Sequence, residues 1–236
     1  MKILSNMNEI VETKYGCEFC KREFLRESTV LKHLCEYKQR WITKDLHGNR
    51  IGFQSWVQFY TKNTSSKKKR TYEDFIKSAY YTAFVKFGTY CVDVNVINVS
   101  RFVDWLLKNQ IKIDTWCQDT IYTKFLIEYL RIEDPLDAIA RSVQTTIDLS
   151  EPERLLSKDY LRYGNSNKIC YAITTGKISP WMLYHSDSGT KFLDKLDQTQ
   201  VKIVIDYINP ELWAIKFKRE PENVQQVKEL LNAGGY

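Results

Sequence analysis

The sequence lacks the features that mark membrane-spanning, secreted and intrinsically disordered proteins. Of its 236 residues only 9 are glycine and 5 are proline, and a short lysine run is its one low-complexity tract. No stretch reaches the roughly 18 consecutive apolar residues of a membrane span. The first residues include Glu9 and have no continuous apolar core of the kind found in secretion signals. Because 43% of the residues are hydrophobic, the chain can bury a core. We therefore expect a soluble, cytoplasmic protein of one or two domains.

Motifs of the common enzyme classes are also missing. The sequence has no GxxxxGK[ST] phosphate loop, no GxGxxG after an expected strand and no HExxH. His185 lies beside Ser186, Asp187 and Ser188, but adjacent residues do not readily adopt the geometry of a catalytic triad. We interpret this segment as a helix cap followed by a turn. An enzyme is therefore disfavoured, although a nuclease built from dispersed carboxylates stays open.

The positive charge is confined to the first third of the chain. Residues 1–75 contain 15 basic and 9 acidic residues, whereas residues 76–236 contain 20 of each. Clustered cations favour phosphate binding, because each neutralised phosphate releases counterions. A well-solvated surface would show the same surplus, so charge alone does not decide between the two.

The six cysteines fall into two groups. Cys91, Cys117 and Cys170 are isolated in apolar surroundings, and we predict that they are core thiols. The other three lie within the first 35 residues, and such clustering in an intracellular protein indicates a metal site.

The segment KYGCEFCKREFLRESTVLKHLC carries the strongest signal. Cys17 and Cys20 form a C-x2-C turn, and His33 follows on an expected helix. Tyr15, Phe24 and Val30 occupy the spacing of a small core that folds around an ion. Residues 15–40 thus resemble a C2H2-type zinc finger in a CCHC variant. The resemblance implies bound Zn²⁺ and a small ββα-like module.

The fourth ligand departs from the family pattern. Cys35 follows His33 by only two positions, which on an intact helix separates the two side chains by about 200°. Cys35 can therefore bind only if the helix tightens or stops near His33. His47 is the rival ligand, and we favour Cys35 because a thiolate so near the ion would rarely stay uninvolved.

The finger also supplies candidate nucleic-acid contacts. In the family, helix positions −1, 2, 3 and 6 face the major groove when the first histidine is at position 7. In this chain those positions hold Arg26, Ser28, Thr29 and Lys32. We expect further phosphate contacts from basic residues on both sides of this helix. They are Lys21, Arg22, Lys38, Arg40, Lys67, Lys68, Lys69 and Arg70. One finger covers about three base pairs, too few for specific binding alone.

We expect a mainly α fold, with the ββα-like finger followed by a compact multi-helix domain. The expected boundaries are a finger module at 1–48, a helix and basic loop at 49–70, and a helical domain at 71–236. Residues 38–53 suggest a hairpin or loop that turns at 47–49, residues 71–88 one helix stopped by Gly88, and residues 89–99 a short strand or an extended link. Three cap-and-proline pairs predict helix starts. They are Asp134–Pro135, Ser179–Pro180 and Asn209–Pro210.

Beyond the finger, three segments carry a second resemblance. They are RYGNSNKICYAITTGKISPWMLY, SGTKFLDKL and INPELWAIKFK. They are similar to an uncharacterised group of tailed-bacteriophage proteins in which a finger precedes a helical domain. The resemblance implies a protein made in the host cytoplasm during infection, and it supplies no activity.

Two functions remain open at this point. We favour a non-enzymatic zinc-finger protein that binds nucleic acid, DNA more than RNA, in replication, transcription or packaging. The alternative is an adaptor or assembly component that contacts a phage or host protein and uses zinc structurally. The sequence predicts no membrane partner.

Overall fold

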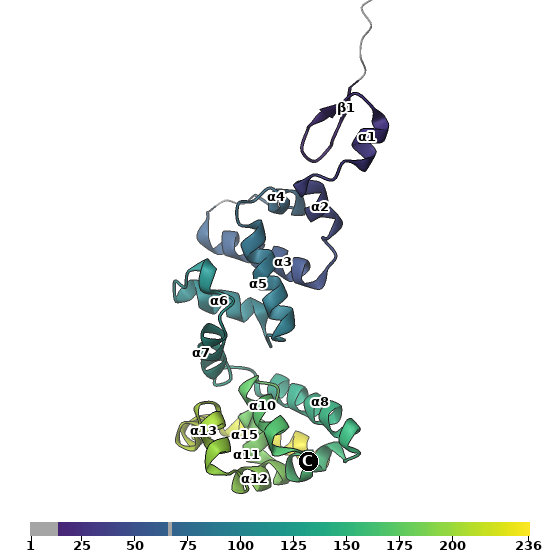
Figure 1. Cartoon of the computed structure of the whole chain (residues 1–236). Helices are drawn as coiled ribbons and strands as arrows, with labels where there is room; N and C mark the ends of the chain where they lie inside the picture. The colour runs from purple at the N-terminus through teal and green to yellow at the C-terminus, as the bar shows by residue number, and fades with distance from the viewer. Residues whose placement is uncertain (1–13, 66–67) are drawn as a thin grey trace, which may run out of the picture. The chain divides into compact units, whose positions relative to one another are not determined.

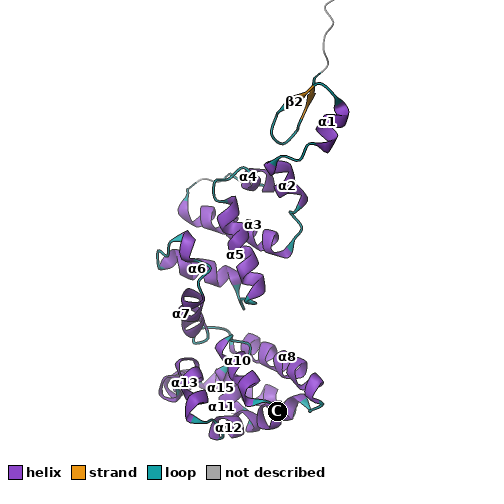
Figure 2. Ribbon diagram, in the orientation of Figure 1, coloured by secondary structure: helices purple, strands orange, loops and turns teal. Residues whose placement is uncertain are grey.

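The computed structural model describes residues 14–65 and 68–236, and it confirms the mainly α fold class. Helices dominate the described residues, with a small two-stranded sheet near the N-terminus (Figures 1 and 2). The chain forms two compact units, the first ending at Asp114 and the second beginning at Thr115. This division differs from the expected boundaries at 48 and 70, because the helices between 71 and 108 pack with the helix that precedes them. None of the described helices combines the length and apolar character needed to cross a lipid bilayer.

The first unit begins with the finger module and continues as a small helical bundle. Its elements are β1 (Tyr15–Gly16), β2 (Glu23–Phe24), α1 (Glu27–Lys32), α2 (Glu36–Ile42), α3 (His47–Asn63), α4 (Tyr72–Ile76), α5 (Tyr81–Asp93) and α6 (Val99–Lys108). The 3₁₀ turn η1 (Ile113–Thr115) contains the division between the two units of the chain. The two strands pair antiparallel, with Tyr15 opposite Phe24. The order β1, β2, α1 confirms the ββα-like module.

One of the expected turns is helical. The predicted hairpin around residues 47–49 is wrong, because α3 begins at His47 and continues to Asn63. Asn49 is buried in its first turn and donates its side-chain N–H to the carbonyl of Thr43, 2.7 Å away. This hydrogen bond ties the start of α3 to the end of α2, so the residues that suggested a turn stabilise a helix start.

Gly88 does not stop a helix as predicted but lies inside α5, where α5 crosses α3. A Cβ atom at Gly88 would lie 1.9 Å from the carbonyl oxygen of Gly48, and one at Gly52 would lie 2.5 Å from the carbonyl oxygen of Phe84. Glycine at these positions allows the two backbones to approach closely. The same packing explains why residues 89–93 continue the helix instead of forming the expected strand, since Cys91 is buried on the core face.

The predicted helix 71–88 is broken between α4 and α5. Thr71 caps α4 as expected, in a capping box with Asp74. The chain then turns at Ser78, whose hydroxyl accepts the backbone N–H of Tyr80 and the indole N–H of Trp56, each at 3.1 Å. The tertiary contact with Trp56 fixes a turn that local propensity did not indicate.

The second unit consists of short helices around a core of aromatic and aliphatic side chains. Its elements are α7 (Asp119–Tyr129), α8 (Pro135–Glu153), η2 (Ser157–Asp159), α9 (Tyr160–Tyr163), α10 (Ser166–Thr174), α11 (Pro180–His185), α12 (Asp187–Asp194), α13 (Gln198–Ile208), α14 (Pro210–Arg219) and α15 (Pro221–Ala233). The side chains of Asp134, Ser179 and Asn209 accept backbone N–H groups at the starts of α8, α11 and α14. The three predicted helix starts are therefore confirmed.

Candidate metal centre

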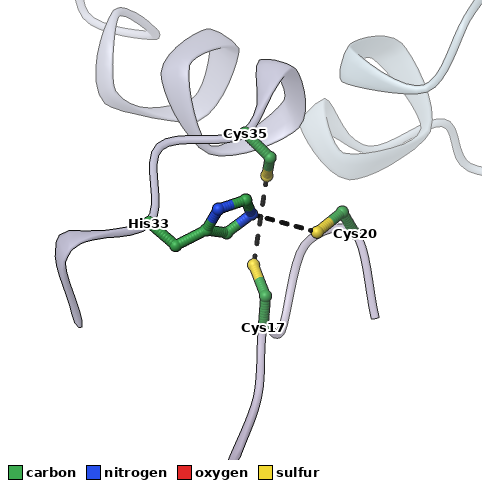
Figure 3. A group of neighbouring side chains, drawn as sticks. All are labelled: Cys17, Cys20, His33 and Cys35. Atoms are coloured by element: carbon green, nitrogen blue, oxygen red, sulfur yellow. Dashed lines mark hydrogen bonds between the residues drawn. The ribbon is translucent and has the colours of Figure 1, made fainter. Parts of the chain in front are cut away.

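Four side chains of the finger module converge on one point (Figure 3). The donor atoms of Cys17, Cys20, His33 and Cys35 all lie within 4.8 Å of one another. The Sγ atoms of Cys17 and Cys35 are 3.9 Å apart, and Sγ of Cys20 lies 3.3 Å from Nε2 of His33. A tetrahedral ion with metal–sulfur bonds of about 2.3 Å and a metal–nitrogen bond of about 2.0 Å requires S···S and S···N separations of about 3.8 and about 3.5 Å. The residues present therefore fit a bound metal ion.

The C-x2-C turn directs two thiols to the same side. Its ends are closed by backbone hydrogen bonds, from Cys17 N–H to the carbonyl of Arg22 at 2.9 Å and from Lys21 N–H to the carbonyl of Cys17 at 2.8 Å. Lys21 adopts a left-handed backbone conformation with φ of 60°. Hydrogen bonds from the backbone of Cys20 and then Phe19 lower the pKa of the Cys17 thiol below its ordinary value of 9.0. The turn thus favours the thiolate of Cys17, which is the form that binds metals. The backbone hydrogen bond from Arg22 lowers the pKa of the Cys20 thiol, but burial and the neighbouring thiols of Cys17 and Cys35 outweigh it, so that this pKa is raised instead.

A break in the helix brings Cys35 to the cluster. α1 ends at Lys32, and His33 has extended backbone angles of φ −67° and ψ 122°. Cys35 is the N-cap of the next helix, α2, with φ −80° and ψ 163°. This is the interruption that coordination by Cys35 required. His47, the rival ligand, begins α3 and does not belong to the metal-binding group found among the described residues.

Aromatic contacts hold the module together and join it to α2. The ring of Phe24 lies 4.8 Å from the imidazole of His33, between centroids. The ring of Phe19, inside the C-x2-C turn, lies 6.0 Å from that of Trp41 in α2, and Trp41 in turn contacts Tyr72 at 5.9 Å. The module is therefore continuous with the helical bundle.

Most of the nucleic-acid candidates of the finger lie on its exposed surface. The exposed members are Lys21, Arg22, Arg26, Ser28, Thr29 and Lys32. Ser28, Thr29 and Lys32 line a shallow depression of about 350 Å³ together with Phe24 and His33. The outer face of α1 is thus polar and basic beside the metal cluster.

Two other candidates are engaged within the protein. The ammonium group of Lys38 donates to the carbonyl of Leu31 at 3.2 Å, near the end of α1. The Arg40 side chain is only 17% exposed and pairs with Glu36. Its guanidinium also donates to the carbonyl of Ile76 and lies 4.3 Å from the ring centroid of Tyr81. Arg40 therefore anchors α2 on the bundle, a role that its sequence surroundings did not signal.

The basic run is also partly engaged by neighbouring side chains. Lys67 lies outside the described residues. Lys68 forms an ion pair with Asp74 at 3.0 Å, and Lys69 is exposed. The guanidinium of Arg70 lies 4.0 Å from the ring centroid of Tyr60. Residues 68–70, the described part of the run, therefore offer fewer unengaged cations than the sequence suggests.

Sequence reasoning missed three exposed leucines on the finger module. Leu25, Leu31 and Leu34 are 68%, 70% and 58% exposed. The available signal was their position outside the spacing of the finger core, which Phe24 and Val30 occupy. Exposed large apolar side chains mark a contact surface where they form a contiguous patch.

The remaining cysteines and His185 have structural surroundings. Cys91 and Cys170 are buried, as predicted for core thiols, and Cys117 is half-buried. Ser186 caps α12 by accepting the N–H of Gly189 at 3.0 Å, which confirms the predicted cap. His185 instead donates its Nδ1–H to the carbonyl of Trp181, 3.0 Å away.

Comparison with protein-family models, with curated proteins and with solved structures gives no match for this chain. The metal centre and the surfaces around it are therefore the features that bear on function.

Proposed function

We propose that the protein binds nucleic acid through a zinc-stabilised finger at its N-terminus. Three thiols and one imidazole form a soft donor set, and a closed four-ligand arrangement of this kind is typical of structural zinc. Cys17, Cys20, His33 and Cys35 would hold the ion. The ion would stabilise the fold of a module whose helix α1 has only six residues.

The outer face of α1 carries this proposal. Arg26, Ser28, Thr29 and Lys32 are all exposed, while His33 turns toward the metal cluster. Arginine and lysine bind phosphates and guanine edges, and hydroxyl groups bind phosphates or bases. Lys21 and Arg22 add positive charge on the adjacent turn. We favour DNA over RNA because this face matches the groove-facing positions of a finger. Its role during phage infection is a proposal that depends on the sequence resemblance.

Fluorescence anisotropy with labelled duplex DNA, single-stranded DNA and RNA tests this function. We expect affinity to fall steeply with salt, by a slope of about 0.9 in log K per log salt for each phosphate contact to duplex DNA. The double variant Arg26→Gln/Lys32→Gln should reduce that slope by about 2. A matched control, Arg162→Gln/Lys202→Gln, removes two charges from the second unit and should leave the slope unchanged. Absence of binding to all three probes at low salt would refute the proposal.

A protein-binding adaptor is the second candidate, and the exposed leucines favour it. Leu25, Leu31 and Leu34 would be buried by a protein partner, and such binding depends little on salt. Substituting the three leucines with serine should abolish capture of a partner while leaving nucleic-acid binding intact. Loss of nucleic-acid binding with partner capture retained would favour the first candidate.

A further inference from the structure

A concave site in the second unit combines positive charge with an aliphatic wall. It has a volume of about 260 Å³. One side is Arg131, which follows α7, and the other is α14 with the start of α15. Its full lining is Arg131, Leu212, Trp213, Ile215, Lys216, Arg219 and Glu220. We call it the α14 pocket.

The charges in the α14 pocket are unequally balanced. Both carboxylate oxygens of Glu220 accept hydrogen bonds from Lys216, at 2.7 and 2.9 Å, and one accepts another from Asn223 at 3.1 Å. Glu220 and Lys216 therefore neutralise each other. The excess positive charge is that of Arg131 and Arg219, which come from separate segments of the chain.

The Nε atom of Arg131 lacks a hydrogen-bond acceptor among the described residues. This atom is also buried. A buried donor without an acceptor is costly, since it has lost water and gained nothing in return. Arg131 also lines the α14 pocket, and arginine binds carboxylates in a bidentate geometry.

The aliphatic wall selects for an apolar group beside the acid. Leu212 and Ile215 are 42% and 48% exposed, and with Arg219 they follow the i, i+3, i+7 spacing of one face of α14. The one aromatic ring in the lining, Trp213, is only 1% exposed, so it cannot stack on a nucleic-acid base. The pocket therefore suits an aliphatic side chain with a neighbouring carboxylate better than a nucleotide.

We propose that the α14 pocket binds an acidic, leucine-containing peptide segment of a partner protein. The carboxylate lies against Arg131 and Arg219, and the aliphatic side chain packs on Leu212 and Ile215. This second binding site is independent of the finger, so the protein links whatever the finger binds to a protein carrying such a segment.

Fluorescence anisotropy of the full-length protein with a labelled peptide tests the proposal. The probe is a capped twelve-residue peptide of repeated Glu-Leu-Ser, and the control peptide carries Gln in place of Glu. We expect saturable binding of the acidic peptide, at least about fivefold tighter than the control peptide, since charged hydrogen bonds are each worth about a factor of ten or more. Equal affinity for the two peptides, or no saturable binding up to millimolar protein, overturns the proposal.

Substitutions in the α14 pocket test whether the acidic peptide binds there. Arg131→Gln/Arg219→Gln should weaken binding of the acidic peptide at least about fivefold, and the matched Arg162→Gln/Lys202→Gln should change it less than about twofold. Arg219→Gln alone and Leu212→Ser/Ile215→Ser alter exposed side chains, so their loss of binding is separable from misfolding. Unchanged binding in these variants places the peptide elsewhere and refutes the pocket. A dT12 oligonucleotide is added as a competitor of the peptide. If it displaces the peptide, and if its own binding requires Arg131 and Arg219, the ligand is nucleic acid and the proposal is also overturned.

Discussion

The Sγ atom of Cys35 accepts the backbone N–H of Lys38 at 3.4 Å, in the first turn of α2. Cys35 is therefore both a member of the metal-binding cluster and the N-cap of the next helix. Because α2 contacts the finger through Trp41 and the bundle through Arg40, the metal centre is coupled to the junction between them.

The first prediction concerns the fourth ligand. Cys35→Ser should weaken zinc binding by more than about tenfold, because it removes one of four donors. It should also speed amide hydrogen exchange in α2, where the cap is altered. Inductively coupled plasma mass spectrometry measures the bound zinc, and hydrogen exchange measures the helix.

His47→Ala is the matched control for this prediction. His47 begins α3 and lies outside the cluster, so the variant should retain one zinc ion per chain. Loss of zinc from His47→Ala together with its retention by Cys35→Ser would show that the ligand assignment is wrong.

The second prediction separates Arg40 from the other cations of the finger. Arg40→Gln removes contacts with Glu36, the Ile76 carbonyl and the Tyr81 ring, so it should lower the free energy of unfolding by about 2 kcal/mol. Arg26→Gln should leave that free energy within about 0.5 kcal/mol, because Arg26 is exposed. Urea unfolding followed by circular dichroism compares the two variants.

The effects of Arg26→Gln and Arg40→Gln on nucleic-acid affinity should be the reverse of their effects on stability. The affinity is measured at a temperature where both variants are folded. Arg26→Gln should weaken binding, and Arg40→Gln should have little effect. Equal loss of binding without loss of stability in Arg40→Gln would mean that its guanidinium also reaches phosphates.

Local patterns predicted the parts of the fold that depend on neighbouring residues. The metal cluster follows from the spacing of Cys17, Cys20 and His33, and the start of α8 follows from Asp134 and Pro135. In each case the residues that form the feature are close in sequence and have one dominant local use.

Features decided by tertiary packing could not be predicted in this way. Gly88 has the local character of a helix stop, but its lack of a side chain is used where α5 crosses α3 at Gly48. Arg40 has the local character of a phosphate contact, but its guanidinium meets groups that lie more than thirty residues further along the chain. The α14 pocket likewise joins Arg131 to residues of α14, and neither segment signals it alone.

The third prediction tests the glycine crossing. Gly88→Ala should destabilise the first unit by about 3 kcal/mol, because its Cβ would lie 1.9 Å from the carbonyl oxygen of Gly48 and the helices must separate. Gly16→Ala is the control, since nothing lies within 4 Å of a Cβ there. Thermal unfolding should show a lower Tm for Gly88→Ala and little change for Gly16→Ala. A Gly88→Ala variant as stable as the original chain would exclude such close packing of α3 and α5.

The fourth prediction concerns pH and His185. Burial lowers the pKa of His185 below its ordinary value of 6.5, and the charge of Lys228 lowers it further, against the hydrogen bond to the Trp181 carbonyl. The unfolded chain therefore binds a proton more readily than the folded one. The stability that depends on neutral His185 is fully present above about pH 6.5 and is lost as the pH falls toward the folded pKa.

Comparison with His185→Gln isolates this contribution. The pKa values of Glu153 and Asp187 are lowered, first by hydrogen bonds from Lys168 and Lys191. The stability that these carboxylates contribute is present above their ordinary pKa values of 4.5 and 3.8 and is lost only below them, outside this window. Burial raises the pKa of Glu133, which acts with the opposite sign and is common to both proteins. Urea unfolding of the second unit between pH 7 and 5 should show a smaller loss of stability in His185→Gln than in the original chain. Parallel pH profiles would mean that His185 is protonated as easily in the folded protein as in the unfolded one, and that the charged imidazole costs nothing between the rings of Trp181 and Phe217.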